Sequence, residues 1–244
     1  QWLLNPAKVF PLDTPREAER FKTDGFILYT KPVDEYTRSG WHYLTGTAAN
    51  ASLANRACDA ATGLLTSKGS VPAFNPEAKP DYVYVGAVDP DSLPGNIKFI
   101  VDAHRWKEKE NVFPYFVASN AAEMHNYNAS IKFIRLTYAD LNEEMLAILK
   151  NDPSAVVILS SHHANGLGAH RAFMHKLMAY GCDVPVILNR EYKETDVETL
   201  QIKSSADLGA LILDGFCDGI MLNNQDGNVL VTDNCMFGIL QATR

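Results

Sequence analysis

The sequence lacks closely paired cysteines. Its 244 residues contain four of them, Cys58, Cys182, Cys217 and Cys235, and no two are separated by only two residues. A C-x-x-C pair is the usual mark of a zinc ribbon, a thioredoxin-type redox site or a self-contained iron–sulfur site. These classes of protein are therefore disfavoured, no metal site is predicted, and the four thiols are typical of a reduced intracellular protein.

Long apolar runs and a surplus of basic residues are also missing. No apolar run reaches the ~18 residues that a membrane span requires. The chain has 22 basic and 29 acidic residues, a net charge of -7, which argues against a nucleic-acid-binding face. No G-x-G-x-x-G motif follows a predicted strand, and no P-loop lysine is present, so nucleotide binding has no support. The composition, 46% hydrophobic and 21% charged, is that of a globular protein, which we expect in the cytoplasm.

Eight short apolar segments are predicted as β-strands. The continuous apolar run at 155–159 is typical of a strand buried on both faces of a parallel sheet. The eight predicted strands are residues 25–29, 82–85, 97–101, 115–118, 131–136, 155–159, 184–188 and 219–222.

Helical periodicity separates these strands, most regularly in the C-terminal half. Helices are predicted at residues 49–65, 140–150, 169–180, 196–213 and 237–243. Alternating strands and helices indicate an α/β protein with a parallel sheet. Eight such strands in about 250 residues match a single-domain (β/α)8 TIM-like barrel, with missing or irregular helices in the N-terminal half. A doubly wound open sheet would give similar local signals and stays open as an alternative.

Four polar residues follow predicted strands and are candidate ligand-binding residues at the rim. His162 and His163 come after the strand at 155–159, and Asn189 and Arg190 come after the strand at 184–188. Adjacent histidines in an extended chain point to opposite faces, so a shared metal ion is disfavoured. The planar fork of Arg190 suits a phosphate or carboxylate, although an ion pair with the neighbouring Glu191 is the more common arrangement.

A second polar motif lies between the helix at 196–213 and the last strand. Asp214, Gly215, Asp218 and Gly219 could offer carboxylates to Mg²⁺ or Ca²⁺. We favour a structural turn, in which Gly215 ends the helix and Asp218-Gly219 leads into the strand. In a barrel this turn lies at the non-catalytic end. No catalytic residue is therefore predicted from the residues alone.

Three segments carry a resemblance to a known family. They are residues 206–220 (ADLGALILDGFCDGI), 237–244 (FGILQATR) and 157–162 (VILSSH). Together they resemble the long, three-domain form of 4-hydroxy-3-methylbut-2-enyl diphosphate synthase, the IspG/GcpE family. That form carries a barrel-like insertion domain between its catalytic barrel and a C-terminal iron–sulfur domain. The resemblance is specific over about residues 131 to 244.

The resemblance implies that residues 1–244 are this insertion domain. Because the barrel pattern comes without a matched set of acid, base, metal or phosphate-binding groups, we expect the domain to act as a structural spacer. The parent enzyme would be an oxidoreductase of the non-mevalonate (MEP) isoprenoid pathway, converting 2-C-methyl-D-erythritol 2,4-cyclodiphosphate with a [4Fe–4S] cluster and electrons from ferredoxin or flavodoxin. The family's cluster cysteines begin after the Leu-Gln-x-x-Arg segment, so no cofactor and no activity are expected in this chain alone. The absence of an initiator Met agrees with an excised segment.

Two alternatives remain open from the sequence. The first is a self-standing TIM-barrel enzyme that binds a phosphorylated or pterin-like small molecule through His162, His163, Asn189 and Arg190. The second is a docking module for the electron donor. The acid surplus disfavours the second, because ferredoxins and flavodoxins are themselves acidic and would be repelled.

Overall fold

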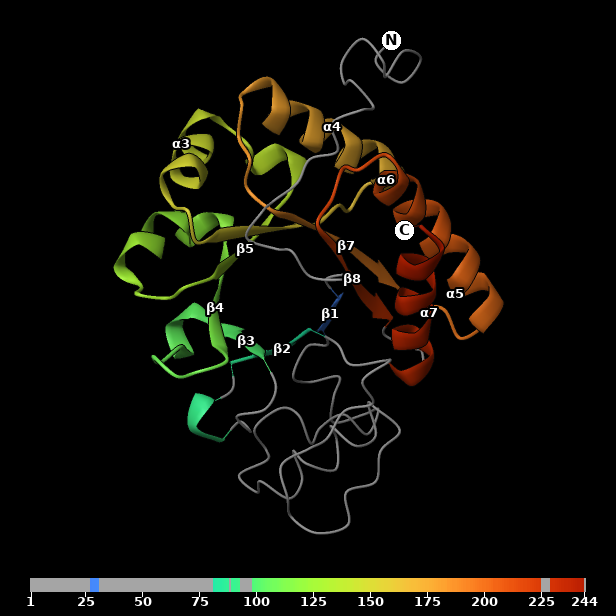
Figure 1. The fold of residues 1–244 in the computed structure, drawn as a ribbon, viewed down its shortest axis with the longest axis horizontal. Helices are drawn as coiled ribbons and strands as arrows, with labels where there is room; N and C mark the ends of the chain where they lie inside the picture. The colour runs from blue at the N-terminus through green and yellow to red at the C-terminus, as the bar shows by residue number, and fades with distance from the viewer. Residues whose placement is uncertain (1–26, 31–80, 88, 93–97, 225–228, 244) are drawn as a thin grey trace.

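Parallel strands dominate the architecture (Figure 1). The computed structural model describes residues 27–30, 81–87, 89–92, 98–224 and 229–243. Its strands are β1 (Ile27–Thr30), β2 (Tyr82–Gly86), β3 (Phe99–Asp102), β4 (Val112–Val117), β5 (Lys132–Leu136), β6 (Ala155–Leu159), β7 (Val186–Tyr192) and β8 (Gly219–Asn224).

Each strand pairs in parallel with its neighbour in sequence, and the sheet curls. β2 to β8 form seven strands in sequential order. β1 has parallel register with both β2 and β8, so the strand order returns to its start. Parallel neighbours cannot be joined by a hairpin turn, so the described connections cross over from one end of the sheet to the other. The predicted α/β class and the parallel, curled sheet of a TIM-like fold are confirmed.

Helices cover the outer face most fully in the C-terminal half (Figure 1). The α-helices are α3 (Glu143–Asn151), α4 (Gly166–Ala179), α5 (Val197–Ser204), α6 (Ala210–Leu213) and α7 (Val229–Ala242), and a π-helical turn, η8 (Ser205–Gly209), joins α5 to α6. In the described part of the connections that precede β5, the helical segments are the 3-10 turns η4 (Pro90–Ser92), η5 (Ala103–Arg105) and η6 (Ala118–Asn126). The irregular connections therefore lie in the N-terminal half.

Strand alternation divides the buried side chains between two hydrophobic cores. Successive side chains of a strand point to opposite faces of the sheet. One core lies between the sheet and the helices and includes Val157, Phe173 and Leu188. The other fills the inside of the curled sheet and is rich in aromatic rings; its buried members are Tyr82, Ile100, Phe113, Tyr115, Phe133, Val156, Ile158, Ile187 and Met221.

The predicted ends of several elements differ from the structure. β7 continues to Tyr192, so Asn189 and Arg190 lie within the strand instead of after it. Pairing with β8 as far as Asn224 supplies the backbone partners that hold this polar extension. α7 begins at Val229, eight residues before the predicted start at 237. The sequence does not predict this start because Val229 to Cys235 are apolar or short polar residues without a clear helical stripe. The helix predicted at 49–65 lies outside the described residues.

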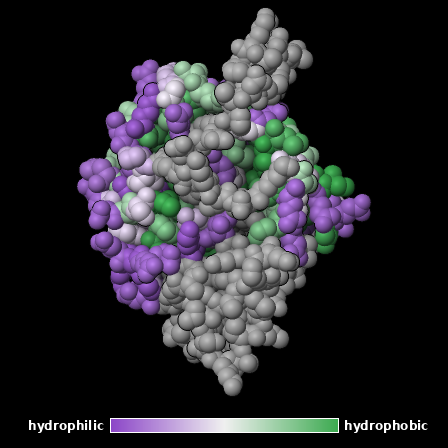
Figure 2. All heavy atoms as spheres, viewed as in Figure 1, coloured by the Kyte–Doolittle hydropathy of each residue, from purple (hydrophilic) through white to green (hydrophobic). Residues whose placement is uncertain are grey.

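The molecular surface is unevenly polar. On the face shown in Figure 2, hydrophilic residues cover most of the side where α3 lies, and hydrophobic residues gather near α6. Leu213 of α6 is 69% exposed and Ile202 of α5 is 62% exposed. Among the helices in the described part of the chain, none has the length and apolar character needed to cross a membrane.

Candidate functional site at the carboxyl ends of the strands

A ring of polar side chains sits above the inner hydrophobic core. At alternate positions, the strands that place aromatic and aliphatic residues inside the sheet end in polar residues on the same face. The pattern is Ile100 then Asp102 in β3, Phe133 then Arg135 in β5, Ile187 then Asn189 and Glu191 in β7, and Met221 then Asn223 in β8. The carboxyl ends of parallel strands share one edge, so these polar groups converge there. This edge is where ligands bind in α/β folds.

The polar ring lines a cavity, which we name the mouth cavity. Its volume is about 540 Å³. Tyr84, Asp102, Tyr115, Arg135, Asn189, Glu191 and Asn223 are its principal polar lining residues, and His104 and Asn120 also line it. This volume lies in the range typical of small-molecule sites.

Hydrogen bonds fix one wall of the mouth cavity. The Tyr84 hydroxyl donates to Asp102 Oδ1 over 2.7 Å, and the Tyr84 and Tyr115 rings lie 4.6 Å apart between centroids. Burial raises the pKa of Tyr115 to about 12, although Arg135, which is hydrogen-bonded to Tyr115, acts to lower it. Tyr115 is therefore a neutral phenol at neutral pH. The Tyr84 and Tyr115 rings form a fixed wall of the cavity, and the hydroxyl of Tyr115 orients Arg135 through their hydrogen bond.

Two buried amide groups of the mouth cavity have an oxygen without a partner. Asn189 is 4% exposed and Asn223 is 5% exposed. Asn189 Nδ2 donates to Ser160 Oγ over 2.9 Å, but Asn189 Oδ1 and Asn223 Oδ1 accept no hydrogen bond within the described structure. A buried polar atom without a partner is uncommon and costs about 1–3 kcal/mol. These two oxygens are therefore the strongest indication that the mouth cavity binds a ligand.

A second cavity, the rim cavity, lies beside the first. It has a volume of about 630 Å³, and His162, His163, Asn189 and Arg190 all line it. Asn189 and Glu191 line both cavities. The structure thus brings together the four candidate residues taken from the sequence.

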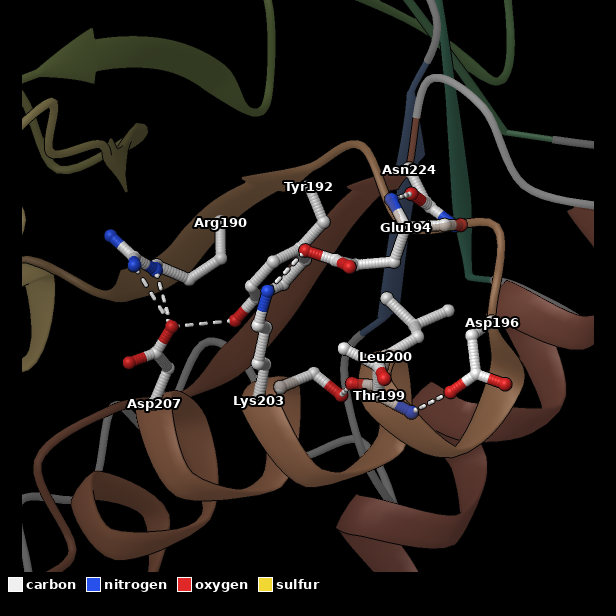
Figure 3. Close-up of polar contacts among 10 residues, drawn as sticks. Arg190, Tyr192, Glu194, Asp196, Thr199, Leu200, Lys203, Asp207 and Asn224 are labelled. Atoms are coloured by element: carbon white, nitrogen blue, oxygen red, sulfur yellow. Dashed lines mark hydrogen bonds and ion pairs between the residues drawn. The ribbon is translucent and has the colours of Figure 1, made fainter.

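Arg190 does not pair with its neighbour Glu191. Its Nε and Nη2 donate to Asp207 Oδ2 over 3.0 and 2.8 Å, and the Tyr192 hydroxyl donates to the same oxygen over 2.7 Å (Figure 3). Asp207 lies on the π-helical turn η8, and wide turns of this kind are frequent at functional positions. Both charged side chains are largely buried, with Arg190 13% exposed and Asp207 25% exposed.

This network changes the ionisation of its members. Burial acts to lower the pKa of Arg190, but the Tyr192 hydroxyl and the Asp207 carboxylate outweigh it, so the net shift is upward. Burial, and then the hydrogen bond to Asp207, hold the pKa of Tyr192 above its usual range. Arg190 is therefore always charged, and its charge is already compensated by Asp207. Its capacity for an external anion is reduced accordingly.

The two candidate histidines are exposed, and the described structure does not place them in a metal-ligating group. Both His162 and His163 lie on the loop between β6 and α4, and the backbone N–H of His163 donates to Ser161 Oγ over 3.2 Å. In the described ranges, no group of three or more His, Cys, Asp or Glu residues is placed to hold a metal ion. The prediction of rim ligand binding by these histidines stays a prediction.

The predicted structural turn lies at the opposite end of the sheet. Gly215 has a φ of +69°, its N–H donates to Ile212 O over 2.9 Å, and the N–H of Phe216 donates to Leu211 O over 2.9 Å. These paired bonds define the Schellman motif that ends a helix. Asp214 forms an ion pair with Arg171 of α4.

Asp218 joins this turn to the sheet. Its N–H donates to Val186 O over 2.8 Å, and its Oδ2 accepts the N–H of Val186 over 2.8 Å. Gly219 is the first residue of β8 and lies beside Ile187. The two carboxylates thus have partners in the protein at the amino end of the strands, away from both cavities.

The described cysteines do not fit an iron–sulfur cluster. Cys182, Cys217 and Cys235 form no disulfide, and they do not form a group of metal-ligating residues. Cys235 Sγ lies 3.3 Å from Ser204 Oγ, and burial raises the pKa of its thiol. The three described thiols are therefore not placed together as the ligands of one cluster. Cys58 lies outside the described residues.

The fold and the site define an α/β protein of the TIM-like class, with a polar site at the carboxyl ends of its strands. The comparisons identify the family. The chain is 60% identical over 165 residues to a 4-hydroxy-3-methylbut-2-en-1-yl diphosphate synthase (flavodoxin) of Parabacteroides distasonis, which covers 68% of this chain and 27% of that protein. The chain is therefore a homologue of a segment of this synthase family, and the resemblance found in the sequence is confirmed.

Further relatives have the same name and the same partial coverage. The proteins of Phocaeicola vulgatus and Bacteroides thetaiotaomicron are 46% identical over 172 residues and 42% identical over 171 residues. Each match covers 70% of this chain and 28% of the relative, so the chain spans about a quarter of their length. No family model and no solved structure matches the chain.

Sequence reasoning missed most of the mouth cavity. Asp102, Arg135, Glu191 and Asn223 were not among the candidate residues, although each follows an inward-facing apolar residue by two or four positions. This even spacing along the strand is the sequence pattern that predicts their position. A polar residue two positions after the last inward apolar residue of a parallel strand faces the mouth of a barrel.

Proposed function

We propose that residues 1–244 form a single (β/α)8 TIM-like domain, with irregular helices in its N-terminal half, inserted into a longer 4-hydroxy-3-methylbut-2-enyl diphosphate synthase, where it acts as a rigid, non-catalytic spacer. One observation carries this proposal. The chain builds its own curled sheet with an inner and an outer core, yet it spans about a quarter of the length of its curated relatives. A self-contained barrel within a longer enzyme is typical of an added domain.

The parent enzyme would carry out the chemistry of the isoprenoid (MEP) pathway in the bacterial cytoplasm. It would reduce 2-C-methyl-D-erythritol 2,4-cyclodiphosphate to 4-hydroxy-3-methylbut-2-enyl diphosphate. A [4Fe–4S] cluster in its C-terminal domain would pass electrons from an external donor to the substrate. The relatives' names specify flavodoxin, which supports flavodoxin as the electron donor of the parent enzyme, with ferredoxin as the alternative. The catalytic barrel and the cluster domain would be the neighbours of this chain within one polypeptide.

The residues of this chain would contribute rigidity. The end of β8 is fixed to the loop after β7, because Asn224 accepts the N–H of Glu194 and donates to its carbonyl oxygen, both over 2.8 Å (Figure 3). At the other end of the sheet, Asp218 joins β8 to β7 through Val186. Correct placement of reacting groups can contribute about 7–11 kcal/mol to a rate, so a stiff spacer can be essential without contacting substrate.

One observation favours a second candidate function, a barrel enzyme that binds a phosphorylated or pterin-like small molecule. His162, His163, Asn189 and Arg190 line the same cavity at the carboxyl ends of the strands. The engagement of Arg190 by Asp207 weakens this candidate, because the guanidinium would have to exchange partners to bind an anion.

The isolated chain provides the first test. Purified 244-residue protein is assayed for reduction of the cyclodiphosphate with reduced flavodoxin, and its visible absorbance is recorded after anaerobic iron–sulfur reconstitution. We expect neither turnover nor cluster absorbance. Turnover by the chain alone would show that the domain is catalytic.

The intact synthase provides the second test. Phe173→Ala removes a fully buried ring between α4 and the sheet and should loosen the barrel by about 3–5 kcal/mol. We expect a lower kcat at unchanged cluster absorbance, with retained secondary structure by circular dichroism. The double variant His162→Ala/His163→Ala is the matched control and should keep full activity. Full activity in Phe173→Ala would contradict the spacer role, and loss of activity in the histidine variant would favour the second candidate.

A further inference from the structure

The mouth cavity holds more unsatisfied polar groups than a structural role requires. Asn189 Oδ1 and Asn223 Oδ1 are buried without hydrogen-bond donors in the described structure. Replacing either asparagine by an apolar residue would remove its unpaired oxygen, although at Asn189 it would also remove the hydrogen bond to Ser160 Oγ. A spacer selected only for stiffness has no use for buried, unpaired oxygens, whereas a binding site does.

The charged groups of the cavity are also open to a ligand. Arg135 contacts the Tyr115 hydroxyl, but within the described ranges no carboxylate lies within 4 Å of its guanidinium nitrogens. Glu191 is exposed at the edge of the cavity and likewise has no cation within that distance among the described residues. This arrangement differs from that of Arg190, which faces the other side of β7 and is paired.

The donors and acceptors of the cavity define the chemistry of its ligand. Four groups accept hydrogen bonds: the two Asn oxygens, Glu191 and the remaining oxygen of Asp102. One group, Arg135, presents a planar cationic fork, which matches a carboxylate. The complement of this set is a small molecule with one anionic group and several donors.

The geometry points to a binding site in the mouth cavity for a small organic acid that also carries hydroxyl or ammonium donors. Its carboxylate would pair with Arg135, and its donors would satisfy Asn189 Oδ1, Asn223 Oδ1 and Glu191. The Tyr84 and Tyr115 rings would form a fixed apolar wall. The cavity volume of about 540 Å³ accommodates a molecule the size of an amino acid or a sugar acid. This site goes beyond the spacer role and does not depend on it.

Four probes test the proposal on the intact protein by calorimetric titration. D-gluconate combines a carboxylate with hydroxyls, and L-glutamine combines a carboxylate with an ammonium group. Sorbitol has the hydroxyls without the acid, and acetate has the acid without the donors. We expect saturable binding of gluconate or glutamine only. No saturable binding of either acid, or equal binding of sorbitol or acetate, would overturn the proposal.

Variants assign any binding to this cavity. Arg135→Met should weaken the bound acid by at least about tenfold, because the charge-assisted pair is lost. Arg105→Met is the matched control, since Arg105 is exposed and does not line the cavity, and it should bind normally. Equal affinity in both variants would place the ligand elsewhere and overturn the proposal.

Asn223→Leu separates a binding role from a structural one. Hydrogen exchange of the amides in β5 and β8 of the intact protein reports the local stability of the barrel. We expect Asn223→Leu to slow this exchange without ligand, because an unpaired buried amide oxygen is removed, and to abolish the binding of the acid. Faster exchange would show that Asn223 stabilises the fold, and retained binding would show that it does not contact ligand; either result overturns the proposal.

Discussion

The guanidinium of Arg190 lies directly against Gly166 at the first turn of α4. A β-carbon added to Gly166 would come within 1.8 Å of Arg190 Nη1. The amino end of a helix is electropositive, so a cation at this position is unfavourable by itself. Asp207, which accepts two bonds from the same guanidinium, supplies the opposite charge. The position therefore requires a glycine on one side and a carboxylate on the other.

Gly166→Ala should destabilise the protein only while Arg190 is present. The added methyl group forces the guanidinium off Asp207, and we expect the unfolding free energy to fall by about 1–3 kcal/mol. In the Arg190→Ala background the same change should be neutral or stabilising, because alanine favours a helix over glycine by about 1 kcal/mol. Urea denaturation of the four proteins in this double-mutant cycle measures the coupling. Additive effects would show that the two residues do not meet.

Asp207→Asn should destabilise the protein strongly. It keeps the size of the side chain but leaves the largely buried Arg190 without its counter-charge, and breaking a buried pair costs about 3 kcal/mol. The unfolding free energy from urea denaturation is the measurement. Glu198→Gln, at an exposed position on the same helical segment, is the control and should change it by less than about 0.5 kcal/mol. Equal stability of the two variants would contradict a stabilising ion pair.

The elements of the C-terminal half could be predicted because their local signals agree with their environment. The run at 155–159 is apolar throughout, and β6 has the same bounds because both of its faces are buried. The end of β7 could not be predicted in this way. Residues 189–192 read Asn-Arg-Glu-Tyr, and they are extended because β8 supplies their backbone partners, which is a tertiary effect.

The sequence predicts where the candidate site residues lie, but not which residue pairs with Arg190. Chain order placed His162, Asn189 and Arg190 near the carboxyl ends of adjacent strands, and all three line one cavity. Asp207, the partner of Arg190, lies seventeen residues away in sequence on a different element. Only the packing of η8 against β7 brings it there, so no local pattern could reveal the pair.

His170 should make the stability of the protein depend on pH. It is fully buried on α4, neither ring nitrogen has a hydrogen-bond partner in the described structure, and burial, with a smaller contribution from Arg190, lowers its pKa from 6.5 to about 4. Between these two values the unfolded state binds the proton and the folded state does not. The contribution of the neutral imidazole is therefore complete above pH 6.5 and is lost as the pH falls toward 4.

The measurement is the unfolding free energy of the wild type and of His170→Leu at a series of pH values from 4 to 7. The difference between the two proteins should change by about 3 kcal/mol in favour of the variant as the pH falls, because each pKa unit corresponds to about 1.4 kcal/mol. His162→Gln, at an exposed position, should follow the wild type at every pH. A constant difference between wild type and His170→Leu would show that His170 titrates normally in the folded state.

Two glycines should respond in opposite ways to alanine. Gly215 has a φ of +69° in the Schellman motif after α6, and a side chain in this left-handed region costs about 1–2 kcal/mol. Gly238 lies on the exposed side of α7, where an added β-carbon would meet no atom within 4 Å. Gly215→Ala should therefore lower the thermal midpoint, and Gly238→Ala should raise it by a few degrees, because alanine is the better helix former. Calorimetric melting of both variants beside the wild type measures the two shifts. Shifts of the same sign would mean that the chain does not end α6 with a left-handed residue at Gly215, or that α7 does not extend through Gly238.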